Sequence, residues 1–441
     1  MAAHIRVRTG RKGPVFAALV SLLAASVPSP GMAGDAGPAI DGAPTERAGV
    51  AGSAAEAIAR SRQRVADIER TAGIGPELAV ALADLAVAES VGGDIVTATL
   101  TIDRATAVLG GAGDVPFARF AVVLARARVQ AADGRPQDAM ATCQRLLMDK
   151  AALKAAPVEF RTSNYQLILA LAGDLLRPPW ESPVAMTRGN RAAASMVDDE
   201  RTTYGRLSPE RIPGLMDAAD WYSLTAQISR GRAVLVEVIE VATDAYGARD
   251  ARLAEPLLAL GNTYLDEGKK PDEARQAFMR GLGLAYPADA ESARYRASLH
   301  AALGDADVQF DAPGAGAAHY AAAWRELAGH PEWGPGGADA VFAAPVPLYL
   351  PVVPSPKVAV SNDLRGWVRP GPGPGTLSFI FTVRPDGRID DLRLESWDGV
   401  AGAVPDRSTS AAQMGRARWR PRVAGGVPVA AEGQRQVVEW R

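Results

Sequence analysis

The sequence predicts an α+β protein in which a long helical region precedes a small C-terminal domain of strands and one helix. Two observations carry this expectation. Residues 51–330 are rich in alanine and place apolar residues at helical spacing, in segments separated by glycine. In residues 377–399, apolar side chains recur at alternate positions on both sides of the turn Pro385-Asp386-Gly387, which is a strong β-hairpin signal.

Bulk composition restricts the function. The 441 residues suggest two or three domains, and 48% hydrophobic with 22% charged residues indicates a folded chain. A formal net charge of −2 gives no general attraction to nucleic acid or to an anionic membrane. The single cysteine, Cys143, excludes an internal disulfide framework, and its place in an amphipathic pattern predicts a buried, inert thiol.

The N-terminus resembles an export signal. Arginines and a lysine precede an apolar run at residues 15–27, which is shorter than the roughly 20 residues that span a bilayer. Prolines end this run, and small residues at Gly31 and Ala33 suit signal peptidase. We therefore predict a cleaved signal peptide at residues 1–33 and a flexible mature N-terminus at residues 34–50. An uncleaved helical anchor is the alternative.

Within the helical region, residues 257–287 contain Leu257-x2-Leu260-Gly261-x2-Tyr264, then Ala274-x3-Phe278, then Pro287. This order resembles the tetratricopeptide repeat (TPR), a pair of antiparallel helices. Small residues let the two helices approach, while the aromatic rings fill the space between them. The predicted repeat core is Leu260, Gly261, Tyr264, Ala274 and Phe278.

Other repeat copies are weaker. Gly93, Gly134 and Gly268 each follow one helical pattern and precede another, as helix stops do, and Gly231 would mark a further repeat. Another helix pair is expected at residues 291–303 and 316–327. Residues 177–207 lack helical periodicity and are predicted to form an ordered insertion. The region at 51–330 is then either a TPR-like solenoid whose concave face holds a protein segment or a helical bundle without a groove.

Residues 331–374 are rich in proline and glycine and predict an extended linker of polyproline type. Apolar residues such as Phe342, Leu348 and Tyr349 would let part of it dock on the helices. After this linker the predicted order is strand, strand, helix, strand, and the last strand covers residues 434–440.

Residues 375–441 resemble the C-terminal domain of the TonB family. The matching phrases are Val383-x-Pro385-Asp386-Gly387-Arg388-Ile389, Trp419-x-Pro421 and Gly426-Val427-Pro428-Val429. The resemblance implies a β-β-α-β domain that binds a short segment of an envelope protein by adding a strand to its sheet edge. We expect residues 434–440 to form that edge, and residues 363–441 to fold alone.

The arginines in residues 416–422 alternate with apolar residues, and in an extended strand they would place four positive charges on one face. Such a face would attract an acidic partner segment. The candidate partner-binding residues are Arg416, Arg418, Trp419, Arg420, Val438 and Trp440.

Signatures of enzymes are absent from the sequence. The four histidines lack metal-ligand spacing, and no P-loop, no G-x-S-x-G and no C-x2-C occurs. We therefore predict no catalytic, cofactor-binding or metal-binding residues, and neither nucleic acid nor a small molecule as a partner.

The predicted function is that of a periplasmic, non-enzymatic protein–protein interaction protein. Its repeats would recruit one partner, and its C-terminal domain would bind a segment of an outer-membrane receptor or of an inner-membrane complex. The alternative is a TonB-like energy transducer that supports receptor-dependent transport and is anchored in the inner membrane by an uncleaved N-terminal helix. An envelope enzyme without recognisable motifs is a third possibility.

Overall fold

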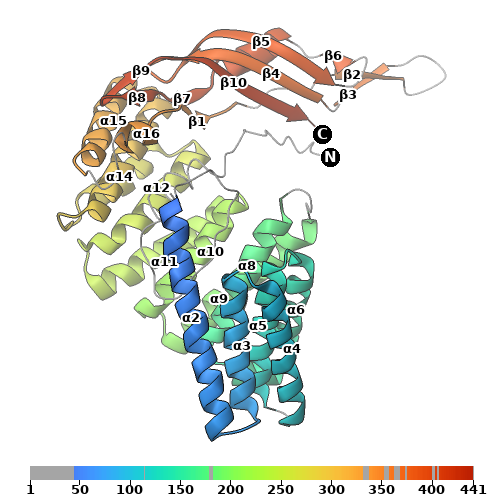
Figure 1. Ribbon diagram of the computed structural model, residues 1–441. Helices are drawn as coiled ribbons and strands as arrows, with labels where there is room; N and C mark the ends of the chain where they lie inside the picture. Colours follow the sequence, from blue (N-terminus) through green and yellow to red (C-terminus); the bar gives the residue numbers. More distant parts are fainter. Residues whose placement is uncertain are drawn as a thin grey trace. The chain divides into compact units, whose positions relative to one another are not determined.

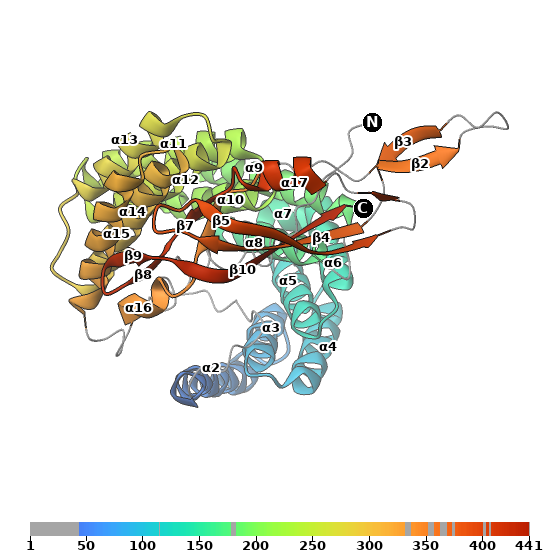
Figure 2. The same ribbon diagram turned by 90° about the horizontal axis from the view of Figure 1, so that it is seen from above.

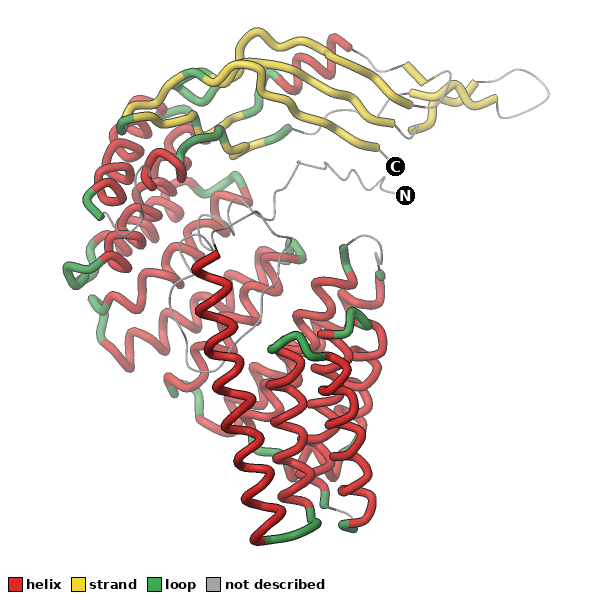
Figure 3. Tube along the Cα trace, viewed as in Figure 1, coloured by secondary structure: helices red, strands yellow, loops and turns green. Residues whose placement is uncertain are grey.

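A computed structural model describes most of the chain, which is mainly helical with a small C-terminal sheet region (Figures 1 and 3). The described residues are 44–113, 115–177, 182–330, 337–351, 357–361, 368–372, 375–399, 403–404 and 407–440. The predicted signal peptide lies outside them. The described chain divides into two compact units, one ending at Ala245 and the other beginning at Tyr246.

The first unit is built from helices that follow one another along the chain. They are α2 (Pro44–Thr71), α3 (Pro76–Val91), α4 (Ile95–Gly111), α5 (Pro116–Ala132), α6 (Pro136–Met148), α7 (Lys150–Ala155), α8 (Val158–Leu175), α9 (Pro183–Tyr204), α10 (Ile212–Leu224) and α11 (Ile228–Tyr246), with a 3-10 turn η1 (Pro209–Arg211) before α10. Neighbours pack as pairs, α3 with α4, α5 with α6 and α8 with α9. Their alanines allow close packing, and Cys143 is fully buried among them, as predicted. None of the helices described has both the length and the apolar character needed to cross a membrane.

The predicted helix stops are confirmed at three glycines. Gly93, Gly134 and Gly268 have φ angles of +85°, +70° and +68°, a left-handed conformation that glycine adopts without a steric penalty. Gly231 is different, because it lies inside α11 and packs against Tyr222. The prediction that Gly231 marks a repeat turn is therefore wrong.

The predicted insertion at residues 177–207 is mostly helix α9. Pro183 occupies its first turn, where the missing N–H costs nothing. Its buried residues recur at helical spacing but are mostly small, which hides the periodicity: Ala185, Gly189, Ala192, Ala193, Met196 and Glu200. A Cβ added at Gly189 would overlap the ring of Trp221, so close helix packing explains the glycine. Helix α2 likewise begins at Pro44, inside the segment predicted to be flexible.

The second unit begins with helices and continues with strands. Its helices before the strands are the 3-10 turn η2 (Ala251–Leu253), α12 (Ala254–Glu267), α13 (Pro271–Leu282), α14 (Ala290–Gln309), α15 (Pro313–Ala328) and α16 (Gly337–Val341). Helix α12 packs with α13, and α14 packs with α15, so the helix pair expected after residue 290 is confirmed.

The strands and the last helix of this unit are β1 (Val346–Tyr349), β2 (Lys357–Ser361), β3 (Val368–Pro372), β4 (Gly375–Val383), β5 (Ile389–Gly399), β6 (Ala403–Val404), α17 (Arg407–Met414), β7 (Arg418–Arg420), β8 (Arg422–Ala424), β9 (Val427–Val429) and β10 (Ala431–Trp440). The main sheet has the antiparallel order β10-β4-β5 (Figure 2). The predicted hairpin is confirmed, because β4 pairs with β5 and Gly387 has φ +76° in the turn.

The predicted polyproline linker contains regular structure where it is described. Strand β1 pairs with β7, and β2 pairs with both β3 and β6. Prolines are tolerated because β1 and β3 are edge strands of their sheets, where a missing N–H need not interrupt a ladder. The docking expected of Phe342 is observed, since this side chain is buried against Tyr320 of α15.

One face of the β10-β4-β5 sheet forms a core. Leu377, Phe379, Phe381 and Val383 alternate along β4 and are each at most 2% exposed. They pack with residues from α17, β7 and β10, namely Met414, Trp419 and Val438. Period-two alternation along β4 therefore indicates a sheet with one buried face, as the sequence predicted.

Candidate protein-binding surfaces

The predicted repeat core lies between α12 and α13. Phe278 is completely buried, and a Cβ added at Gly261 would overlap its ring. Ala274 is also fully buried, whereas Leu260 and Tyr264 are partly buried. Ala274, Phe278 and Tyr264 belong to one apolar cluster, so their role in the structure is internal packing.

Arg420, one of the predicted partner-binding residues, is buried inside the second unit. Its Nε donates to Asp305 Oδ1 at 2.8 Å and its Nη2 donates to Asp305 Oδ2. The hydroxyl of Tyr320 donates to the same Oδ1 at 2.9 Å. Burial acts to lower the pKa of Arg420, but the neighbouring Asp305 carboxylate outweighs it and holds that pKa above its ordinary value. The cluster therefore links β7 to α14 and α15 by a charged, dry contact.

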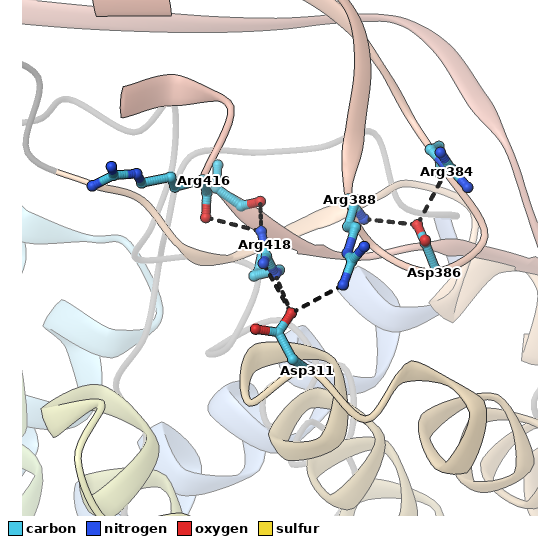
Figure 4. A network of polar contacts seen from close by, with 7 residues as sticks. Asp311, Arg384, Asp386, Arg388, Arg416 and Arg418 are labelled. Carbon is cyan, nitrogen blue, oxygen red and sulfur yellow. Dashed lines mark hydrogen bonds and ion pairs between the residues drawn. The ribbon is translucent and has the colours of Figure 1, made fainter. Parts of the chain in front are cut away.

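Arg418 contacts Asp311, just beyond the C-terminal end of α14. Its Nη2 donates to Asp311 Oδ1 at 2.9 Å, and Arg388 Nη2 approaches the same oxygen at 3.5 Å (Figure 4). Asp311 follows α14 in a left-handed conformation, with φ +63°. The hydrogen bond from Arg418 lowers the pKa of Asp311 below its usual range. Arg388 comes from the β4–β5 turn, so one carboxylate connects the hairpin and β7 to the end of α14.

The predicted positive face does not form, because the arginines have different surroundings. Arg420 is only 2% exposed and Arg418 is half-buried, while Arg416 is exposed. Trp419 and Val438 are buried in the sheet core, and the side chain of Trp440 lies outside the described part of the structure. The prediction of an accessible binding face is therefore wrong for Trp419, Arg420 and Val438, since their contacts hold the unit together.

Strand β10 forms one edge of the main sheet, where the sequence predicts a binding edge. Its ladder with β4 continues without a register shift from the pair Gln434–Phe381 to the pair Trp440–Gly375. No strand among those described pairs with its other side. Half of the backbone N–H and C=O groups of a regular edge strand point outward and are available to another strand.

The opposite edge, β5, is irregular. Its ladder with β4 shifts register twice, and Asp391 adopts φ +50°. Bulges of this kind twist an edge and discourage pairing with another chain. The β10 ladder shifts register once, between Ala431 and Gln434, so its regular stretch is residues 434–440.

The side chains of β10 separate by face. Gln436 and Val438 are buried on the core side, while Arg435 is exposed and Val437 is half-buried on the other side. Arg435 Nη2 donates to Glu395 Oε1 of β5 at 2.6 Å, across β4. A strand added to β10 would meet Arg435 and Val437 on the outer face.

The sequence alone did not reveal the residues that engage these arginines. Asp305, Tyr320 and Asp311 are separated from residues 416–420 by about a hundred positions. One signal was present, because Asp305 and Asp307 interrupt an otherwise apolar stretch of α14 and are 0% and 5% exposed. A buried carboxylate is stable only beside a cation or several hydrogen-bond donors. An arginine in an otherwise apolar strand can supply both.

Comparisons with known proteins leave the class of this protein open. No family model matches the chain, and no curated protein matches it. Among solved structures, BtubC (BKLC) from P. vanneervenii is similar at 15% identity, over 67% of this chain and 95% of that chain, with a TM-score of 0.39. NprR in complex with its cognate peptide NprX is similar at 12% identity, over 68% and 82%, with a TM-score of 0.32. Scores this low carry no argument about function.

Proposed function

We propose that this protein is a non-enzymatic protein–protein interaction protein that captures an extended segment of a partner by strand addition at β10. The observation that supports this is the stretch of β10 at residues 434–440, which has no register shift and lies at the opposite edge of the sheet from the bulged strand β5. In such a complex the backbone supplies most of the hydrogen bonds, and side chains on alternate positions supply selectivity. Arg435 and Val437 are the candidates for that selectivity on the outer face.

The resemblance to the TonB family supports the same site. The resemblance implies binding at the edge of the last strand, and β10 is the last strand described, although β6, β7, β8 and β9 also lie between β5 and β10 in the chain. Under this proposal the chain acts in the periplasm on an envelope protein, and the TPR-like helices recruit a second partner. The second candidate function is that of an energy transducer, which requires residues 15–27 to remain as a membrane anchor. The observation that favours it is the apolar run at those residues.

The edge is tested by site-specific photo-crosslinking in envelope extract. A photoreactive residue at Val437 is expected to label one segment of a captured protein, mapped by mass spectrometry. The same residue at Arg393 of β5 is the matched control and should label no common segment. Equal labelling from both positions, or none from Val437, contradicts the proposal.

A pair of proline variants adds a test of the backbone. The backbone N–H groups of neighbouring residues in a strand point in opposite directions. Of the two variants Gln434→Pro and Arg435→Pro, one therefore removes a backbone hydrogen bond to β4, and the other removes a backbone N–H that points away from the sheet. We expect one of the two variants to keep the melting temperature and to lose crosslinking from Val437. Val438 is unsuitable for this purpose, because its side chain is only 2% exposed and a change there also disturbs the core. Retention of full crosslinking in both folded variants would exclude strand addition.

A further inference from the structure

Two histidines meet on the α14–α15 helix pair. His300 Nδ1 of α14 lies 3.3 Å from His319 Nδ1 of α15, and the ring centroids are 5.5 Å apart with an interplanar angle of 31°. Both side chains are half-buried, so solvent reaches them. Neither residue belongs to the β10 edge or to the arginine contacts.

We propose that His300 and His319 together bind a divalent transition-metal ion of the Zn²⁺ type through their Nδ1 atoms. Imidazole nitrogens lie about 2.0–2.1 Å from zinc, and at a tetrahedral angle two such nitrogens are about 3.3–3.4 Å apart. The observed separation of 3.3 Å matches that spacing, and it also lets one ring donate a hydrogen bond to the other when no ion is bound. The two rings are thus already placed as a pair of neighbouring ligands.

A carboxylate lies beside the ring of His319. Asp307 Oδ2 faces His319 Nε2 at 3.9 Å, on the ring nitrogen that is not part of the proposed ligand pair. Carboxylates commonly orient metal-binding histidines in this way. Arg275 fixes Asp307, because its Nη2 donates to Asp307 Oδ1 at 2.9 Å.

The site is open to solvent on the His300 side. A pocket of about 490 Å³ adjoins it, lined by His300, Ala322, Arg325, Glu326, Gly329 and His330. Throughout the described ranges, no three His, Cys, Asp or Glu side chains are arranged to hold a metal ion. The ion would therefore have two protein ligands, and water from the pocket would complete its coordination, which predicts readily exchanged metal.

Metal binding here would join α14 to α15. The same helix pair carries Asp305 and Tyr320, which hold Arg420 of β7. A ligand that binds only the folded state raises its stability, so the ion should raise the melting temperature of the second unit.

The test is a calorimetric titration of the chelator-treated full chain with zinc sulfate. We expect saturable binding of one equivalent, a higher melting temperature with zinc, and zinc-dependent shifts of two imidazole resonances in the NMR spectrum. His300→Gln and His319→Gln should each weaken binding at least tenfold and abolish the melting shift. His330→Gln is the matched control, since His330 lines the same pocket without belonging to the pair.

Two outcomes would overturn the proposal. One is the absence of saturable binding and of imidazole shifts in the natural chain, which needs no variant to fold. The other is unchanged affinity in the double variant of His300 and His319. The β10 proposal stands or fails separately, because its crosslinking test involves neither histidine.

Discussion

The contact between Arg420 and Asp305 shows what a single buried charge requires. Both side chains are nearly inaccessible, at 2% and 0% exposure, so each loses its hydration on folding. Two hydrogen bonds between them and a third from Tyr320 replace that hydration. A buried ion pair of this kind contributes little net stability compared with apolar residues, but removal of one partner is costly because the other charge remains buried.

A double-mutant cycle tests this contact. Arg420→Met should lower the free energy of unfolding of the second unit by about 3–5 kcal/mol, because Asp305 would remain buried without its cation. Arg420→Met combined with Asp305→Leu should recover much of that loss. Denaturant unfolding of the four proteins gives the coupling energy. Simple addition of the two single losses would mean that the residues do not act as a pair.

Glu200 of α9 is a second residue whose environment decides its charge. It is 3% exposed, and a Cβ added at Gly214 would overlap its carboxylate. Burial raises the pKa of Glu200 to about 7, against the hydrogen bond from Thr162, which lowers it. The protonated form is therefore favoured in the folded state below neutral pH.

This raised pKa predicts how stability depends on pH. The contribution of Glu200 is fully present below the ordinary carboxyl pKa of about 4.5 and is lost as the pH rises through about 7. Glu200→Gln, which cannot ionise, should flatten the fall in the melting temperature of the first unit between those pH values. Asp198→Asn on the same helix, where Asp198 is exposed, is the control. An identical pH profile in Glu200→Gln and the natural protein would contradict the assignment.

At the scale of elements, the α12–α13 pair depends on one close contact. Phe278 fills the space that Gly261 leaves, and Gly268 ends α12 in a left-handed conformation. The two helices therefore approach where the smallest residue faces the largest ring.

Variants on both sides of this contact should destabilise the pair. Phe278→Ala should cost about 3–5 kcal/mol through the cavity it leaves. Gly261→Ala should cost about 1–3 kcal/mol through overpacking against the ring. Met279→Ala, at an exposed neighbouring position, should change the melting temperature little. Equal melting temperatures for Phe278→Ala and Met279→Ala would exclude a packing role for Phe278.

At the scale of the whole molecule, the last strands fold on helices rather than apart from them. A Cβ added at Gly387 of the β4–β5 turn would overlap Val308 of α14 and the backbone of Trp419. The backbone N–H of Trp419 donates to the Gly387 carbonyl at 2.9 Å. With β1 paired to β7 and Arg420 bound to Asp305, the sheet region has contacts that residues 363–441 alone would lack.

Fragment stability follows from these contacts. A fragment of residues 246–441 should unfold cooperatively, whereas residues 363–441 should not, because the shorter fragment loses β1 and leaves Arg420 without Asp305. This expectation differs from the sequence-based one, in which residues 363–441 fold alone. Circular dichroism melts of both fragments provide the measurement. A cooperative transition of the shorter fragment at the temperature of the longer one would contradict this account.

The amino-acid sequence by itself determined the local elements of this protein. The left-handed glycines at residues 93, 134 and 268, the β4–β5 hairpin and the alternation along β4 follow from interactions within a few residues, which periodicity and turn chemistry record. The edge position of β10 also agrees with the sequence-based expectation, although that came from a resemblance rather than from local pattern.

Only the tertiary structure decided which residues remain accessible. Alternating arginines are typical of a solvated face, yet Arg420 is buried because Asp305, 115 positions earlier, supplies its counter-charge. Helix α9 was not predicted, because its buried face consists mostly of glycine and alanine, which give no apolar periodicity. The packing of Gly189 against the ring of Trp221 shows that this face is buried. The prolines in residues 337–372 predicted an extended linker. Strands β1 and β3 form there nevertheless, because each lies at a sheet edge, beside β7 and β2 respectively. In each case the deciding partner is distant in sequence, and its contribution enters the free energy only once the chain has folded.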